Sequence, residues 1–147
     1  MKETFALDTS GAVAGPVTYP MGAAMRGMIR WPDLSPFAQG YVEAMFASLP
    51  DEEFWQGGFG FSDLAPETLA AILRDCEVFV SFLTGEYDDA TMRMMGREFW
   101  RARNGAADAF MAWPLNRPAL IERSRAFPPL TPSLGDDGRV YLKEKTQ

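Results

Sequence analysis

Carboxylates crowd the middle of this chain, and their chemistry is the first that the sequence suggests. Residues 33–92 contain twelve acids and one base, Arg74, a net charge of −11, whereas residues 93–147 contain ten bases and six acids, a net charge of +4. Such a split creates a strong local field, which acts on partners and association rates more than on the fold. The twelve acids are Asp33, Glu43, Asp51, Glu52, Glu53, Asp63, Glu67, Asp75, Glu77, Glu86, Asp88 and Asp89.

Grouped carboxylates can hold Mg²⁺ when they converge in a pocket, or they can replace phosphates opposite Lys and Arg in a basic protein groove. The chain contains no histidine, the commonest general base and transition-metal ligand. Catalytic triads, zinc hydrolases and Cys-His chemistry are therefore excluded in their usual forms. We expect a protein that is not an enzyme and needs no metal or cofactor. The less favoured alternative is an enzyme that uses paired carboxylates on Mg²⁺. Thermal stabilisation of the protein on addition of divalent metals would reveal such a site.

The contact residues that we predict combine acids with an aromatic ring. Three carboxylates stand beside large rings in the segment Asp51–Trp55, and aromatic anchors are typical of binding sites, although these rings can equally fold back onto the core. Further acids lie on the helices that follow. The predicted partner-binding residues are Asp51, Glu52, Glu53, Trp55, Glu67, Asp75, Asp88 and Asp89.

A single cysteine, Cys76, allows no internal disulfide and no zinc knuckle, which indicates a reducing compartment. The N-terminus lacks the continuous apolar centre of a secretory signal, and no apolar run approaches the length of a membrane span. We therefore expect a soluble protein of the cytosol with no membrane contact. Because Cys76 lies on an apolar helix face, a small buried thiol is favoured over a nucleophile.

The length suits one domain, and the predicted fold is α+β: a helical core of three to four helices with one or two small antiparallel hairpins. A weakly determined arm over residues 1–32 precedes a single domain over residues 33–147. The first helix should begin at Pro36 behind the N-cap Ser35 and end near Pro50.

A central helix should run from Pro66 to just before Gly85. One face carries Leu69, Ile72, Leu73, Cys76, Val80 and Leu83 at helical spacing. The opposite side is also apolar, so this helix is either sandwiched in the core or meets a partner. The residues of that possible apolar interface are Ala71, Val78 and Phe82.

Asp88 or Asp89 should cap a third helix that ends at or near Gly96. The Asn104-Gly105 pair then favours a hairpin over residues 98–113, and the alternative is a helix that continues from about residue 90 to 112. Under the hairpin interpretation four guanidiniums cluster, either as a phosphate or carboxylate clamp or, as we favour, to neutralise the protein's own acidic half. They belong to Arg93, Arg97, Arg101 and Arg103.

Two further elements complete the chain. Pro118 can open a short helix that closes near Phe127, and a final hairpin should turn on Gly135–Gly138 with its outgoing strand from Arg139. The two aspartates of that turn suit turn chemistry, because the alternating oxygen ligands of a calcium loop are missing.

The order of three segments resembles a group of small uncharacterised proteins of tailed bacteriophages and prophages. The segments are the helix beginning with residues 62–69 and reaching Asp75-Cys76, the run from Gly96 to Gly105, and Gly135–Gly138 followed by Tyr141. The resemblance covers roughly residues 35–142. In that group a histidine follows the Asn-Gly pair, where this chain has Ala106, so no role of that histidine carries over. The resemblance implies a biological setting and no catalytic residue.

In that setting, a small acidic protein without catalytic groups suggests a host-defence antagonist in the cytoplasm of the bacterial host. We expect a DNA-mimicking inhibitor that occupies a basic groove of a bacterial defence complex, of CRISPR type or another nuclease, without binding nucleic acid itself. The competing hypothesis is a structural or assembly protein that docks through apolar faces, including as a homodimer. Salt separates the two, because carboxylate-mediated binding weakens as ionic strength rises and apolar docking does not.

Overall fold

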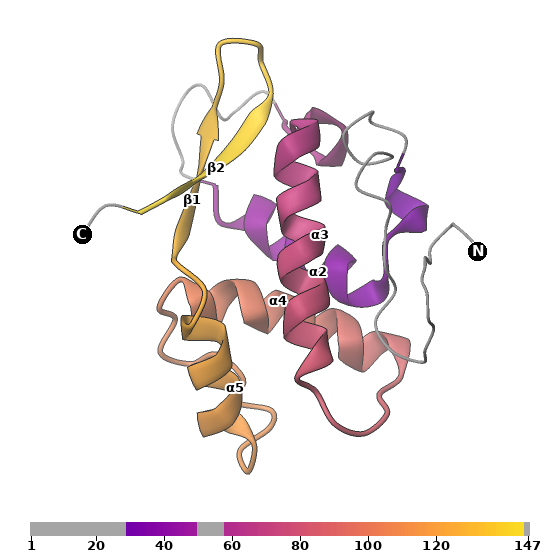
Figure 1. Cartoon of the computed structure of the whole chain (residues 1–147), viewed down its shortest axis with the longest axis vertical. Coiled ribbons are helices and arrows are strands. Elements are labelled where there is room, and N and C mark those ends of the chain that lie inside the picture. Colours follow the sequence, from indigo (N-terminus) through magenta and orange to yellow (C-terminus); the bar gives the residue numbers. More distant parts are fainter. Residues whose placement is uncertain (1–28, 50–57, 146–147) are drawn as a thin grey trace.

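The structure, a computed structural model, describes residues 29–49 and 58–145. Residues 1–28, most of the predicted arm, lie outside the described part, as do Asp51, Glu52, Glu53 and Trp55 of the predicted contact loop. Within the described ranges four α-helices pack together, and one two-stranded antiparallel hairpin lies against them (Figure 1). This is the α+β architecture that the sequence predicts.

Helix α2, Pro36–Ala47, follows its predicted start. The Ser35 hydroxyl accepts a hydrogen bond from the backbone N–H of Ala38 at 3.2 Å, and Pro36 loses no helical hydrogen bond because the first turn has no acceptor for its nitrogen. A short 3₁₀ turn, η1 (Trp31–Asp33), precedes α2, and a second, η3 (Phe61–Asp63), precedes the next helix. The Trp31 ring packs edge-on against Phe61, with ring centroids 5.6 Å apart.

Helix α3, Pro66–Ser81, lies across the front of the other helices in Figure 1. Leu69, Ile72, Leu73 and Cys76 are buried, as their spacing predicts, whereas Val80 and Leu83 are only partly buried. Phe79, which the predicted apolar face omitted, is fully buried. The core-facing stripe of α3 is therefore wider than the predicted one.

The predicted hairpin over residues 98–113 is wrong. Helix α4, Asp89–Arg103, runs without a break through Gly96 and ends at Asn104, which is its C-cap. Gly105 follows in the left-handed region, at φ +91°, a common way for a helix to end. The alternative of a helix reaching residue 112 is also wrong, because turns occupy residues 107–112. The Asn-Gly pair marks a helix terminus and not a strand turn.

Helices α2 and α4 cross in close contact at two glycines. A Cβ atom on Gly40 would lie 1.9 Å from the carbonyl oxygen of Arg93, and one on Gly96 would lie 1.9 Å from the carbonyl oxygen of Phe37. Because no side chain fits there, the two backbones touch directly. Gly96 therefore allows the helix crossing and does not end the helix.

The core is built on stacked aromatic rings contributed by three helices. Phe79 of α3 stacks on Phe99 of α4 at 4.4 Å between ring centroids, and Phe37 of α2 stacks on Phe79 at 5.6 Å. Phe110, which follows α4, lies 6.2 Å from Phe79. All four rings are fully buried, so this cluster fixes how the three helices sit against one another.

The C-terminal elements match their predictions closely. Helix α5, Arg117–Arg125, carries Pro118 in its first turn. Strands β1 (Leu130–Leu134) and β2 (Val140–Glu144) pair in antiparallel register around the predicted turn. An isolated bridge pairs Leu64 with Val140, and the N–H of Ala65 donates to the Val140 carbonyl at 3.1 Å. The hairpin is thereby fixed to the start of α3.

Candidate functional site

Two of the four predicted arginines share one carboxylate. The guanidinium of Arg97 lies 3.4 Å from Glu43 and that of Arg93 lies 3.9 Å from the same carboxylate oxygen, while Arg93 also hydrogen-bonds the Gln39 side chain. Both arginines remain partly exposed. This outer face of α4 is therefore paired with an acid of α2.

The other two arginines are held more firmly. Arg101 pairs with Glu98 at 2.8 Å and with Asp108. Arg103 is buried, with 3% of its surface exposed, and lies 2.9 Å from Asp75. Arg93, Arg97 and Arg103 thus face acids of the protein's own acidic half, the arrangement that we favoured over an anion clamp, whereas Arg101 pairs with two acids of the C-terminal half.

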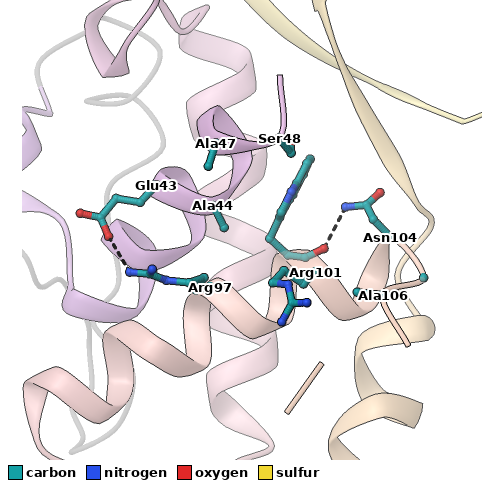
Figure 2. A pocket seen from close by; sticks show the side chains of 10 residues that line it. Glu43, Ala44, Ala47, Ser48, Arg97, Arg101, Asn104 and Ala106 are labelled. Atoms are coloured by element: carbon teal, nitrogen blue, oxygen red, sulfur yellow. Dashed lines mark hydrogen bonds and ion pairs between the residues drawn. The ribbon is translucent and has the colours of Figure 1, made fainter. Parts of the chain in front are cut away.

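A hollow of about 450 Å³ lies between α2 and α4 (Figure 2). Small residues, among them Ala44, Ala47 and Ala106, leave the space open. The Glu43–Arg97 pair lies at one end and Asn104 at the other. Since Asn104 donates to the Trp100 carbonyl at 2.9 Å and accepts from the Leu130 N–H at 2.8 Å, its amide joins α4 to β1. The polar groups of this hollow thus have structural partners already.

The remaining predicted contact residues do not form one patch. Glu67 is exposed in the first turn of α3, whereas Asp88 and Asp89 lie beyond the other end of that helix (Figure 1). Asp75 forms the ion pair with Arg103 and offers no free carboxylate. The described part of the predicted surface therefore loses Asp75 and divides into two regions separated by the length of α3.

One of these regions contains three neighbouring acids, Glu86, Asp88 and Asp89, which we call the acidic rim. Asp88 is the N-cap of α4 and accepts a hydrogen bond from the N–H of Thr91 at 2.8 Å. The Thr91 side chain, and to a smaller extent this N–H, lower the pKa of the Asp88 carboxyl below its usual 3.8. All three residues are exposed, and no ion pair joins the rim to any part of residues 29–49 or 58–145. Glu86 was not among the predicted contacts, although its place beside two aspartates is visible in the sequence.

The possible apolar interface is partly exposed. Ala71 is half-buried, while Val78 and Phe82 keep 41% and 43% of their surface accessible. The guanidinium of Arg123, on α5, covers the Phe82 ring at 4.0 Å from its centroid. Phe82 therefore meets the protein's own α5 on one side and solvent on another.

The cysteine and the acidic side chains of the described ranges can be compared with their predicted roles. Cys76 is buried as predicted, and burial, with a smaller effect of the neighbouring Asp75 charge, raises the pKa of its thiol well above 9.0. Among residues 29–49 and 58–145 no three Cys, Asp or Glu side chains converge as metal ligands do. None of the helices in these ranges has the length and apolar character that a membrane crossing demands.

Comparisons of the chain with protein-family models, with curated proteins and with solved structures gave no match.

Proposed function

We propose that this protein is a non-catalytic inhibitor that occupies a basic, nucleic-acid-binding groove of a bacterial defence complex through its exposed carboxylates. The observation that carries the proposal is the exposed acidic rim, which forms no ion pair with the part of the chain that the structure describes. Asp33, Glu43 and Asp75 each face an arginine of the same chain, whereas Glu86 and Asp89 do not within the described residues. Exposed carboxylates without internal cations remain available to a cationic partner.

The position of the rim supports this role. Asp88 is fixed by its cap to α4, so the rim is attached to a helix end with a defined geometry. Glu67 provides a second exposed carboxylate at the far end of α3, a helix of 16 residues. At about 1.5 Å rise per residue, the two regions are separated by roughly 20 Å, a distance that several phosphates of a nucleic acid also span. The phage setting rests on the resemblance alone.

The experiment is affinity capture from a bacterial lysate that contains defence systems, with bound proteins identified by mass spectrometry. We expect the double variant Glu86→Lys and Asp89→Lys to lose a target that the natural chain captures. The matched control reverses Glu122 and Glu144, two exposed acids of the C-terminal half, which gives the same change in net charge at another place. Asp88 is left intact because its change would weaken α4.

A second pair of substitutions, Glu52→Lys and Glu53→Lys, tests the acidic loop separately. In a separate measurement, the nuclease activity of the captured complex should fall when the purified natural chain is added. Capture that is equal for the natural chain, the rim variant and the control would contradict the proposal. Capture that persists at high salt would favour the competing role, an assembly protein that docks through apolar faces.

A further inference from the structure

The pair Asn104-Gly105, at the end of α4, is a chemically reactive sequence. An asparagine deamidates when the backbone nitrogen of the next residue attacks its side-chain carbonyl carbon, and glycine, which has no side chain, leaves that nitrogen most accessible. Asn116, the other asparagine of the chain, precedes the bulky Arg117. The reaction therefore favours Asn104 over Asn116.

The only co-reactant of this chemistry is water. The Gly105 nitrogen gives up its proton and bonds to Cγ of Asn104, the bond from Cγ to the side-chain nitrogen breaks, and that nitrogen takes up a proton and leaves as ammonia. Water then adds to either carbonyl carbon of the five-membered imide, which yields aspartate or isoaspartate at position 104. Asn104 and Gly105 both line the hollow between α2 and α4, and Gly105 is exposed, so water reaches the pair (Figure 2).

The fold holds the two reacting groups apart. The Asn104 side chain donates to the Trp100 carbonyl at 2.9 Å and accepts from the Leu130 N–H at 2.8 Å. The Gly105 N–H donates to the Ala102 carbonyl at 3.0 Å. At ψ 14° the Gly105 nitrogen and the Asn104 Cβ lie on opposite sides of the Cα–C bond, whereas the ring needs both on the same side. Hydrogen bonds and backbone conformation therefore oppose the attack in the folded chain.

We propose that Asn104 is a modification site that the fold protects: it deamidates when the junction of α4 and β1 opens, and the product does not rebuild the junction. Either product lacks the side-chain N–H that bonds the Trp100 carbonyl, and its carboxylate lies at the negative end of the α4 dipole. Isoaspartate also adds a methylene to the main chain before Gly105. Deamidation thus makes an opening of the junction irreversible and weakens the attachment of β1 to α4.

The first test incubates the purified full chain in mildly alkaline buffer, folded or unfolded in urea, and follows residue 104 by peptide mass spectrometry. The folded chain should deamidate about tenfold or more slowly, because the rate is proportional to the fraction of molecules in which the junction is open. Asn116 in the same samples is the reference for an asparagine without a following glycine. Equal rates at Asn104 in the two conditions would overturn the inference.

A matched pair of variants tests the contact with β1. Leu130→Pro removes the N–H that donates to Asn104, whereas Leu130→Ala loses side-chain packing but keeps this N–H. Because the N–H points to Asn104 and not to β2, proline removes no hydrogen bond of the hairpin. The proline variant, shown to be folded by circular dichroism, should deamidate about threefold or more faster than the alanine variant. Equal rates would contradict protection by this contact, and the comparison in urea decides if proline prevents folding.

The variant Asn104→Asp reproduces one product of the reaction. It should lower the unfolding temperature by about 3 °C or more at neutral pH, because a hydrogen bond is lost and a negative charge is placed at the helix C-terminus. The matched control, Asn116→Asp, makes the same change at the exposed N-cap of α5 and should not lower it. An Asn104→Asp chain as stable as the natural chain would overturn the proposed effect of the modification. No partner protein is present in these tests, so their results are independent of the proposed inhibition.

Discussion

Arg103 is the charged side chain that the described residues bury most completely, and its contacts explain why burial is tolerated. Its guanidinium donates to Asp75 at 2.9 Å, to the Tyr41 hydroxyl at 3.1 Å and to the Pro128 carbonyl at 2.7 and 3.0 Å. The rings of Phe99 and Phe127 lie 5.6 and 5.3 Å from it. A buried charge is costly unless it is paired and hydrogen-bonded, and here it is both.

We predict that Arg103→Met lowers the free energy of unfolding by about 3–5 kcal/mol, because Asp75, Tyr41 and the Pro128 carbonyl all lose their donor. The measurement is urea unfolding followed by circular dichroism. The control, Arg97→Met, removes a half-exposed ion pair, for which about 1 kcal/mol or less is expected. Equal losses for the two variants would show that the Arg103 contacts are no more important than a surface pair.

Sequence reasoning identified Arg103 as one of four clustered cations but missed its burial. The reason is the hairpin interpretation of residues 98–113, which grouped Arg103 with the other three guanidiniums and did not place it in the core. On a helix, position 103 follows Phe99 by one turn and faces the core, where Asp75 lies on α3. Phe79 was missed because it lies at the edge of the apolar stripe of α3 and not at its centre.

At the scale of elements, the crossing of α2 and α4 makes a prediction with an unusual sign. Gly→Ala inside a helix normally stabilises it by up to about 1 kcal/mol. At Gly96 we expect a loss of about 1–3 kcal/mol, because the new Cβ would lie 1.9 Å from the Phe37 carbonyl oxygen and push the helices apart. Gly60→Ala, where no atom lies within 4 Å of the added carbon, should change stability little. Thermal unfolding of both variants measures the difference, and a stabilised Gly96→Ala would refute this packing.

The N-cap of α4 predicts a dependence on pH. Because the folded-state pKa of Asp88 is lowered, the ionised cap contributes stability above pH 3.8, and this contribution is lost as pH falls through the folded pKa. Asp88→Asn keeps a capping side chain but removes the charge. The natural chain should unfold at a higher temperature than this variant at about pH 7, and the gap should close well below pH 3.8. A gap that is independent of pH would mean that the charge of Asp88 adds nothing.

Helix starts were predictable because their signals are local. A capping side chain accepts from an unpaired backbone N–H of the first turn, and a proline there has no N–H to leave unpaired. The structure starts α2, α3 and α4 at such signals, which are Ser35-Pro36, Pro66 and Asp88. The course of residues 98–113 was not predictable in this way. Gly96 and Asn104-Gly105 are ambiguous signals, and the tertiary contact of Gly96 with Phe37 decides in favour of helix.

At the scale of the whole molecule, the distribution of charge along the sequence predicted only part of where unpaired acids lie on the described surface. Glu43 and Asp75 form ion pairs with arginines that lie at least 50 and 28 residues away in sequence. No local sequence pattern therefore reveals that these two acids are neutralised. Glu86, Asp88 and Asp89, in the connection from α3 and at the start of α4, stay exposed and form no ion pair within the described residues. The acidic rim, rather than the whole acidic half, is therefore the surface to test.

The most direct test of the proposed function is the salt dependence of affinity for the target that the protein captures. For the natural chain, the association constant should fall steeply as ionic strength rises, and the Glu86→Lys and Asp89→Lys variant should bind weakly with a much flatter dependence. The variant with Glu122 and Glu144 reversed should behave as the natural chain does. Natural affinity and natural salt dependence in the rim variant would contradict the claim that these carboxylates bind the partner.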